Sequence, residues 1–328
     1  MKNLHSLSTA EFASVPAAVE VIGWRGMSRG VLIRRSALAA YGVTFIAAAV
    51  AFGIPLERNQ VIAWILAALA CASIGRPRRE IGRLIVDWLP FAILLGVYDL
   101  SRGAADTVGM PIHTTEMIDI DRALFGGQAP TVWLQAHLVN PYPVQWYSVP
   151  FTLVYLSHFF VVYIVAGVLW SRNRDRFVAF VKRLMTLATA GLLTYVLFPA
   201  RPPWLAAQEG ALGHVSRSSS AGMSLIGLHV SHTFERGQAL VNPIAAMPSL
   251  HAAFAALVAL FLWPYAGRGW RIVLALYPLA MGFALVATGE HYVTDIVVGW
   301  IYAASVIYAW QWLDRRKRAP VTVSPARP

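Results

Sequence analysis

Long apolar stretches separated by short polar segments run through most of this chain. Eight of them approach the ~20 residues that a helix needs to cross a bilayer. They lie at about residues 37–54, 60–75, 83–99, 149–170, 178–198, 247–264, 270–287 and 292–312. The pattern predicts an all-α, polytopic integral membrane protein with about eight transmembrane helices.

Two polar segments are too long to be simple turns between these helices. Residues 100–148 contain the stretch from Pro130 to Val139, which predicts a short helix lying on the membrane. Residues 199–246 contain a serine-rich patch at 216–220. Long connections of this kind often carry function, so we expect both segments to contribute to a functional site. A further short interfacial helix is predicted from Val15 to Trp24.

The basic residues orient this arrangement in the membrane. Hydrophobic residues make up 57% of the chain and charged residues only 13%, against about a quarter in a soluble domain. The net charge of +11 comes from Lys and Arg in short clusters between the apolar stretches, which argues against a nucleic-acid partner. With a cytoplasmic N-terminus, 21 of the 27 basic residues face the cytoplasm, as the positive-inside rule requires. We therefore expect both termini in the cytoplasm. The short loops and the absence of a glycosylation sequon favour a plasma (inner) membrane location.

The same pattern divides the chain into four segments. We expect a cytoplasmic N-terminal segment without a signal peptide (1–36), two accessory transmembrane helices (37–82), a larger membrane domain (83–312) and a basic cytoplasmic tail (313–328). Cys71 is the only cysteine, which excludes an internal disulfide and a cysteine-based metal site.

Three features that are distant in sequence converge on the outer face in this topology. Arg201 follows the fifth apolar stretch, Ser249 and His251 open the sixth, and His291 and Asp295 open the eighth. Residues four apart on a helix share a face, so Asp295 is expected to bind one nitrogen of His291 and leave the other free as a nucleophile. His251 is the expected acid for the departing oxygen and the base for the attacking one.

These residue types suit phosphoryl transfer without a metal or cofactor. Arg201, Ser249 and the free amides of the helix start would hold the phosphoryl oxygens and stabilise the charge of the transition state. Each feature has a plainer explanation when taken alone: Ser249 could simply cap a helix, and a His/Asp pair could serve helix packing. Their convergence on one face favours the catalytic interpretation.

The residues resemble the type 2 phosphatidic acid phosphatase (PAP2) superfamily, whose three motifs read Lys-x6-Arg-Pro, Pro-Ser-Gly-His and Ser-Arg-x5-His-x3-Asp. Arg201 with Pro202 matches the end of the first motif, Pro248-Ser249-Leu250-His251 matches the second, and His291 with Asp295 matches the end of the third. The resemblance implies a six-helix core within 83–312 and a metal-independent phosphohistidine intermediate on His291. It also implies a phospholipid or polyprenyl-phosphate substrate taken from the lipid bilayer.

The departures from these motifs concern phosphate binding. Thr194 stands where the first motif has lysine, Ala284 and Leu285 stand where the third has Ser-Arg, and Leu250 replaces the glycine of the second. This variant pattern is more similar to the inositol-phosphorylceramide synthase branch, which implies transfer of a phosphorylated head group from one lipid to another acceptor. Arg102, at the outer end of the third apolar stretch, is the candidate to replace a missing cation, and anchoring of the helix end is its alternative role.

Other functions compete with this phosphotransferase. A lipid or polyprenyl phosphate phosphatase of the same superfamily would resolve the same phosphohistidine with water. A transporter or channel would need polar residues through the membrane, whereas these lie at one side, and an inactive scaffold would not need them together. His158, inside the fourth stretch, fits a functional or a packing role. Residues 100–148 and 203–241 are expected to gate and select a substrate whose identity the sequence leaves open.

Overall fold

The structure is a computed structural model that describes residues 28–52, 58–107, 109–139, 144–225 and 243–318. Within these ranges the chain is helical and contains no strand. Each of the eight predicted stretches corresponds to a helix. They are α1 (Arg29–Phe52), α2 (Arg58–Ser73), α3 (Arg78–Thr107), α6 (Ser148–Arg172), α7 (Arg174–Leu197), α10 (Leu250–Leu262), α11 (Arg268–Ala287) and α12 (Val293–Arg318).

Five of these helices, α1, α6, α7, α11 and α12, are long and apolar enough to cross a membrane. The prediction of an all-α integral membrane protein is therefore confirmed. Helix α10 is shorter and is extended by the 3-10 turn η4 (Trp263–Tyr265). Helix α1 begins at Arg29, before the predicted residue 37, because charged residues end an apolar stretch without ending the backbone hydrogen bonds. The predicted helix from Val15 to Trp24 lies outside the described residues.

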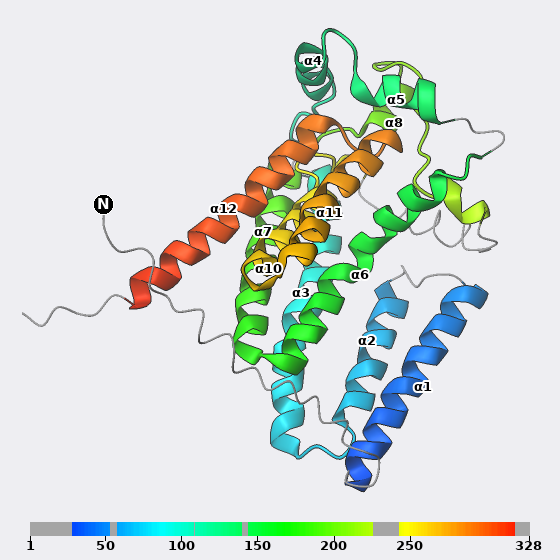
Figure 1. The fold of residues 1–328 in the computed structure, drawn as a ribbon. Helices are drawn as coiled ribbons and strands as arrows, with labels where there is room; N and C mark the ends of the chain where they lie inside the picture. Colours follow the sequence, from blue (N-terminus) through cyan, green and yellow to red (C-terminus); the bar gives the residue numbers. More distant parts are fainter. Residues whose placement is uncertain (1–27, 53–57, 108, 140–143, 226–242, 319–328) are drawn as a thin grey trace, which may run out of the picture.

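The polar segments fold into short helices at one end of the bundle. They form α4 (Thr115–Leu124), α5 (Pro130–Leu138), α8 (Pro203–Gln208) and η3 (Ala221–Ser224). The predicted helix at residues 130–139 is confirmed as α5, with Pro130 in its first turn, where the missing N–H costs no hydrogen bond. Figure 1 shows α4, α5 and α8 together at the end of the bundle where α12 begins.

Small residues let three central helices approach closely. Helices α7, α10 and α12 share the largest apolar core, to which α6 and α3 also contribute. A Cβ added to Gly299 of α12 would lie 2.5 Å from the backbone oxygen of Ser249, and one added to Gly191 of α7 would lie 2.5 Å from the Leu250 side chain. Close packing at small residues is the usual way in which membrane helices associate. Leu250, the departure from the second motif, therefore fills the space that Gly191 leaves.

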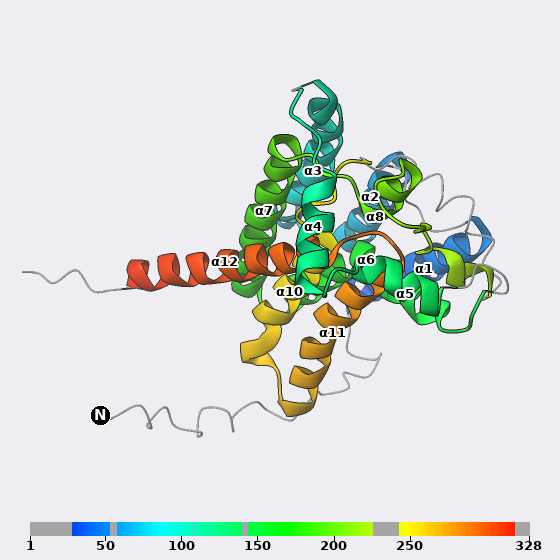
Figure 2. The ribbon, with the colours of Figure 1, turned by 90° about the horizontal axis from the view of Figure 1, so that it is seen from above.

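Helices α1 and α2 lie at the edge of the bundle. Helix α1 packs on α2, and α2 packs on α3 (Figures 1 and 2). None of the described side chains of α1 is buried, although the helix is apolar. An apolar helix without a buried side chain suits a lipid environment.

Polar contacts tie the helices together at the end opposite α4. Asn173 ends α6 and caps α7 by accepting a hydrogen bond from the backbone N–H of Arg176. Asp87 of α3 pairs with Arg174 at 2.6 Å and accepts a hydrogen bond from Trp170 at 3.0 Å. Because Asp87 is buried, these two contacts fix α3 against the α6–α7 turn.

Candidate active site

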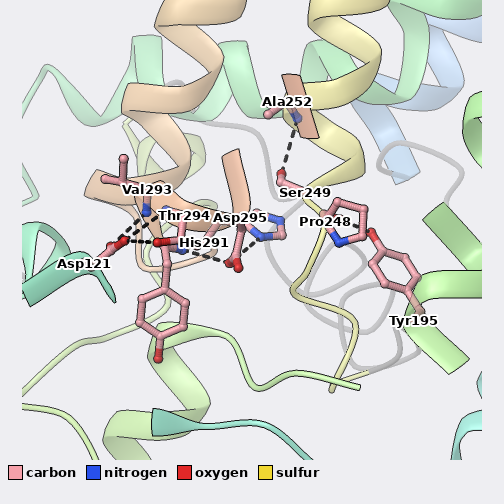
Figure 3. Close-up of polar contacts among 10 residues, drawn as sticks. Asp121, Tyr195, Pro248, Ser249, Ala252, His291, Val293, Thr294 and Asp295 are labelled. Carbon is pink, nitrogen blue, oxygen red and sulfur yellow. Dashed lines mark hydrogen bonds and ion pairs between the residues drawn. The ribbon is translucent and has the colours of Figure 1, made fainter. Parts of the chain in front are cut away.

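His291 and Asp295 lie together where α12 begins. The distance between His291 Nδ1 and Asp295 Oδ2 is 3.3 Å, and the same oxygen accepts the backbone N–H of Tyr292 at 3.0 Å (Figure 3). His291 precedes the helix, which starts at Val293, so the contact spans the first turn rather than a helix face as the spacing predicted. Both side chains are buried. Since Nδ1 faces the carboxylate, Nε2 is the ring nitrogen left for reaction.

Asp121 of α4 holds this turn from outside, a role that no pattern in the sequence indicated. Its carboxylate accepts the backbone N–H groups of Val293 and Thr294 at 3.0 and 2.9 Å and the Thr294 hydroxyl at 2.6 Å (Figure 3). Asp121 is fully buried. It supplies the helix cap of α12 from a distant segment, and no short-range capping signal could reveal it.

Ser249 caps α10 and connects it to α12. Its side chain accepts the backbone N–H of Ala252 at 3.3 Å, and its own backbone N–H donates to the Asp295 carbonyl oxygen at 3.0 Å. Tyr195 of α7 donates to the carbonyl oxygen of Pro248 at 2.9 Å (Figure 3). The helix begins at Leu250, so the capping explanation of Ser249 holds, and its place in phosphate binding stays a prediction.

His251 lies among three other rings of the site. Its ring centroid is 5.6 Å from that of His291, 4.0 Å from that of His158 and 5.0 Å from that of Tyr155, on which it stacks. His251 Nε2 is buried and has no hydrogen-bond partner among the described residues. The structure therefore brings together the histidines of α10 and of the turn before α12, and α6 adds His158 as a third.

Backbone hydrogen bonds join the loop of Arg201 to the segment before α10. Ala200 exchanges hydrogen bonds with Ile244 and Ala246, and Arg201 donates its N–H to His113. The first and second motifs thus lie side by side. The residue pairs responsible are too far apart in sequence for any local pattern to indicate them.

The Arg201 side chain contacts two polar side chains, those of Thr114 and Glu209. Its Nη1 donates to the Thr114 hydroxyl at 2.8 Å, and its Nε is 2.6 Å from the Glu209 carboxylate. Arg102 belongs to α3, but its side chain is outside the described part of the structure. The proposed phosphate contacts of Arg201 and Arg102 stay predictions.

Arg217, in the serine-rich patch at 216–220, is a further cation at the site. Its Nε is 2.9 Å from Glu290 Oε1, and it also interacts with the Tyr155 hydroxyl. Burial alone would lower the pKa of the Arg217 guanidinium, but the neighbouring Glu290 carboxylate raises the pKa above its ordinary value. Arg217 is therefore charged at every physiological pH. In the sequence, only its place in the serine-rich patch pointed to it.

The charged and ring-bearing groups together suit phosphoryl transfer. A histidine nitrogen oriented by a carboxylate can attack phosphorus, and a second histidine can carry a proton. In the described ranges, no three or more His, Cys, Asp or Glu residues are grouped so that they could hold a metal ion.

Comparisons with known proteins agree with this chemistry. The family model of the PAP2 superfamily matches residues 115–309, more than half of the chain. The chain is also 26% identical over 243 residues to a phosphoinositol dihydroceramide synthase of Bacteroides thetaiotaomicron, covering 69% of this chain and 75% of that protein. No solved structure matches the chain significantly. The matched family region runs from α4 almost to the end of α12 and contains every described site residue.

Proposed function

Because this chain belongs to the PAP2 superfamily, we propose that it is a membrane lipid phosphotransferase that moves a phosphorylated head group from a lipid donor to an alcohol acceptor. The observation that carries the proposal is the buried His291, held at Nδ1 by Asp295 with its ring centroid 5.6 Å from that of His251. The name of the bacterial relative supports a phosphoinositol head group as the cargo and dihydroceramide as the acceptor.

In the first step, Nε2 of His291 attacks the phosphorus atom of the donor lipid. The nitrogen–phosphorus bond forms as the bond from phosphorus to the lipid oxygen breaks. In its protonated form, His251 gives a proton to the departing lipid alcohol. Asp295 stabilises the positive charge that develops on the His291 ring.

In the second step, the acceptor alcohol attacks the phosphohistidine. His251 takes the hydroxyl proton as the new oxygen–phosphorus bond forms and the nitrogen–phosphorus bond breaks, so both histidines return to their initial state. Water in place of the alcohol would make the enzyme a phosphatase. The synthase name of the relative favours the transferase, and the deep burial of His291 and Asp295 supports it because such a site excludes water.

The remaining roles follow from position and charge. Arg201, Ser249 and Arg102 would contact the phosphoryl oxygens, without a metal ion. The distribution of basic residues supports an outward-facing site with both termini in the cytoplasm. The short loops without a glycosylation sequon support a plasma membrane location.

The direct test uses purified protein in detergent with phosphatidylinositol and a fluorescent dihydroceramide. We expect a fluorescent phosphodiester product that persists in EDTA, and a His291→Ala variant that folds but makes none. Release of soluble inositol phosphate without a lipid product would assign the phosphatase instead. A fully active His291→Ala variant, or activity abolished by EDTA, would contradict the mechanism.

A further inference from the structure

A buried carboxylate lies next to the proposed nucleophile, and its negative charge must be balanced before an anion can bind there. Glu290 directly precedes His291 and is only 6% exposed. A phosphoryl group at His291 would be repelled by this carboxylate in a site of low dielectric constant. Arg217, 2.9 Å away, supplies the compensating positive charge.

Arg217 connects the surroundings of both histidines. On one side it pairs with Glu290, the neighbour of His291. On the other it interacts with Tyr155, whose ring stacks on His251, and it is close enough to His251 for an electrostatic interaction. A guanidinium has five N–H donors in a planar fork, so it can keep one carboxylate contact and still bind phosphoryl oxygens.

The backbone around Arg217 is fixed on both sides. Ser216 exchanges hydrogen bonds of 2.8 Å with the Gln135 side chain, and Ser218 donates its N–H to the carbonyl oxygen of Thr288. Gly289 has φ +77°, and a Cβ there would lie 2.7 Å from the Ser216 carbonyl oxygen, so the loop packs directly on this glycine.

The Arg217 side chain is also held in place by its neighbours. Ser219 donates its hydroxyl to Glu290 at 2.5 Å, and the guanidinium carbon lies 5.1 Å from the ring centroid of Trp204. A cation over an aromatic face is restricted in its motion. A charge that is already positioned binds the charge of a transition state more effectively than one that must first be ordered.

We infer that Arg217 is a cation that binds the transferred phosphoryl group beside His291, with Glu290 as its partner before substrate arrives. The inference rests on the proposed phosphohistidine chemistry. It gives a function to the serine-rich patch at 216–220. It also compensates for the cation that the third motif lacks, since Ala284 and Leu285 stand in place of its Ser-Arg.

Four variants test this role, each measured for transfer activity and for stabilisation by orthovanadate, a phosphate mimic that raises the melting temperature when it binds. They are Arg217→Gln, Arg217→Lys, the double variant Arg217→Gln/Glu290→Gln, and the control Arg174→Gln, which removes the guanidinium of the Asp87 pair at the other end of the bundle. We expect Arg217→Gln to lower kcat/KM by about 10²–10³-fold, as loss of one transition-state donor does, and to abolish the vanadate shift. Arg217→Lys should recover part of both, and Arg174→Gln should change neither.

The double variant separates phosphate binding from mere neutralisation of Glu290. It contains a neutral pair of similar shape, so it should fold even if Arg217→Gln does not. We expect it to remain as inactive as the single variant and insensitive to vanadate. Recovery of activity and of the vanadate shift in the double variant would overturn the inference. If instead His291→Ala were fully active while the vanadate shift still required Arg217, the phosphohistidine proposal would fail and the anion site would stand.

Discussion

At the scale of single residues, Asp295 orients His291. Its Oδ2 lies 3.3 Å from the ring Nδ1 and accepts the Tyr292 N–H, so one oxygen orients both the ring and the turn that carries it. An asparagine can still accept these hydrogen bonds. It lacks the negative charge that stabilises a positively charged ring, and its amide nitrogen can turn towards Nδ1 and select the wrong tautomer.

We therefore expect Asp295→Asn to lower kcat on the order of 10³–10⁴-fold with little change in KM. The matched control is Asp314→Asn, near the other end of α12, where the aspartate pairs with Arg183 at 2.9 Å. Steady-state kinetics of both variants with the same donor lipid would check the prediction. Equal losses in the two variants would mean that the effect is on folding rather than on His291.

The residues that the sequence could identify are those whose spacing reports their chemistry. His251, His291 and Asp295 were recognisable because short motifs carry them, and the predicted membership of the PAP2 superfamily is confirmed. Arg217 and Glu290 were not, because their contact joins segments 73 residues apart and follows no local period. Charge pairs between distant segments can be recognised only in the three-dimensional structure.

At the scale of elements, α4 acts as a clamp on the start of α12. The Asp121 carboxylate satisfies the two N–H groups and the hydroxyl at the turn that carries His291. Truncating it leaves these buried donors unpaired. Loss of a helix cap costs about 1–2 kcal/mol.

We expect Asp121→Ala to lower the melting temperature in detergent by several degrees and to reduce activity, because the first turn of α12 would shift with its cap. Asp119→Ala is the control, since Asp119 is exposed on the same short helix. Thermal unfolding and transfer activity should be measured on both variants. An Asp121→Ala protein as stable and active as Asp119→Ala would show that α4 does not hold the site.

The helices themselves were largely predictable, and their contacts were not. Apolar stretches alone located the eight helices α1, α2, α3, α6, α7, α10, α11 and α12, since a bilayer demands such stretches. The ends moved by several residues, as at Arg29, where the helix continues beyond the apolar stretch. The close approach of α10 to α12 depends on Gly299, and that of α10 to α7 depends on Gly191. The sequence does not show which residue packs against a given glycine.

At the scale of the whole molecule, the bundle has one end that carries the candidate active site and an opposite end that is basic. The hydrogen bonds of Asp121 to Val293 and Thr294 place α4 at the same end as His291, and Figure 1 shows α5 and α8 there as well. The C-terminal end of α12 carries Arg315 to Arg318. A label on α4 therefore reports the side of the membrane on which the site opens, and a label near the end of α12 reports the opposite side.

Single cysteines in a Cys71→Ser background make this test. We expect Asp119→Cys to react with a membrane-impermeant maleimide in intact cells, because 21 of the 27 basic residues would then lie on the cytoplasmic side. Lys317→Cys, exposed near the end of α12, should react only after the membrane is permeabilised. The reverse pattern would place the histidines on the cytoplasmic side, so that donor and acceptor would have to come from the inner leaflet. Equal labelling of both before permeabilisation would mean that the cells leak, which a cytoplasmic marker protein detects.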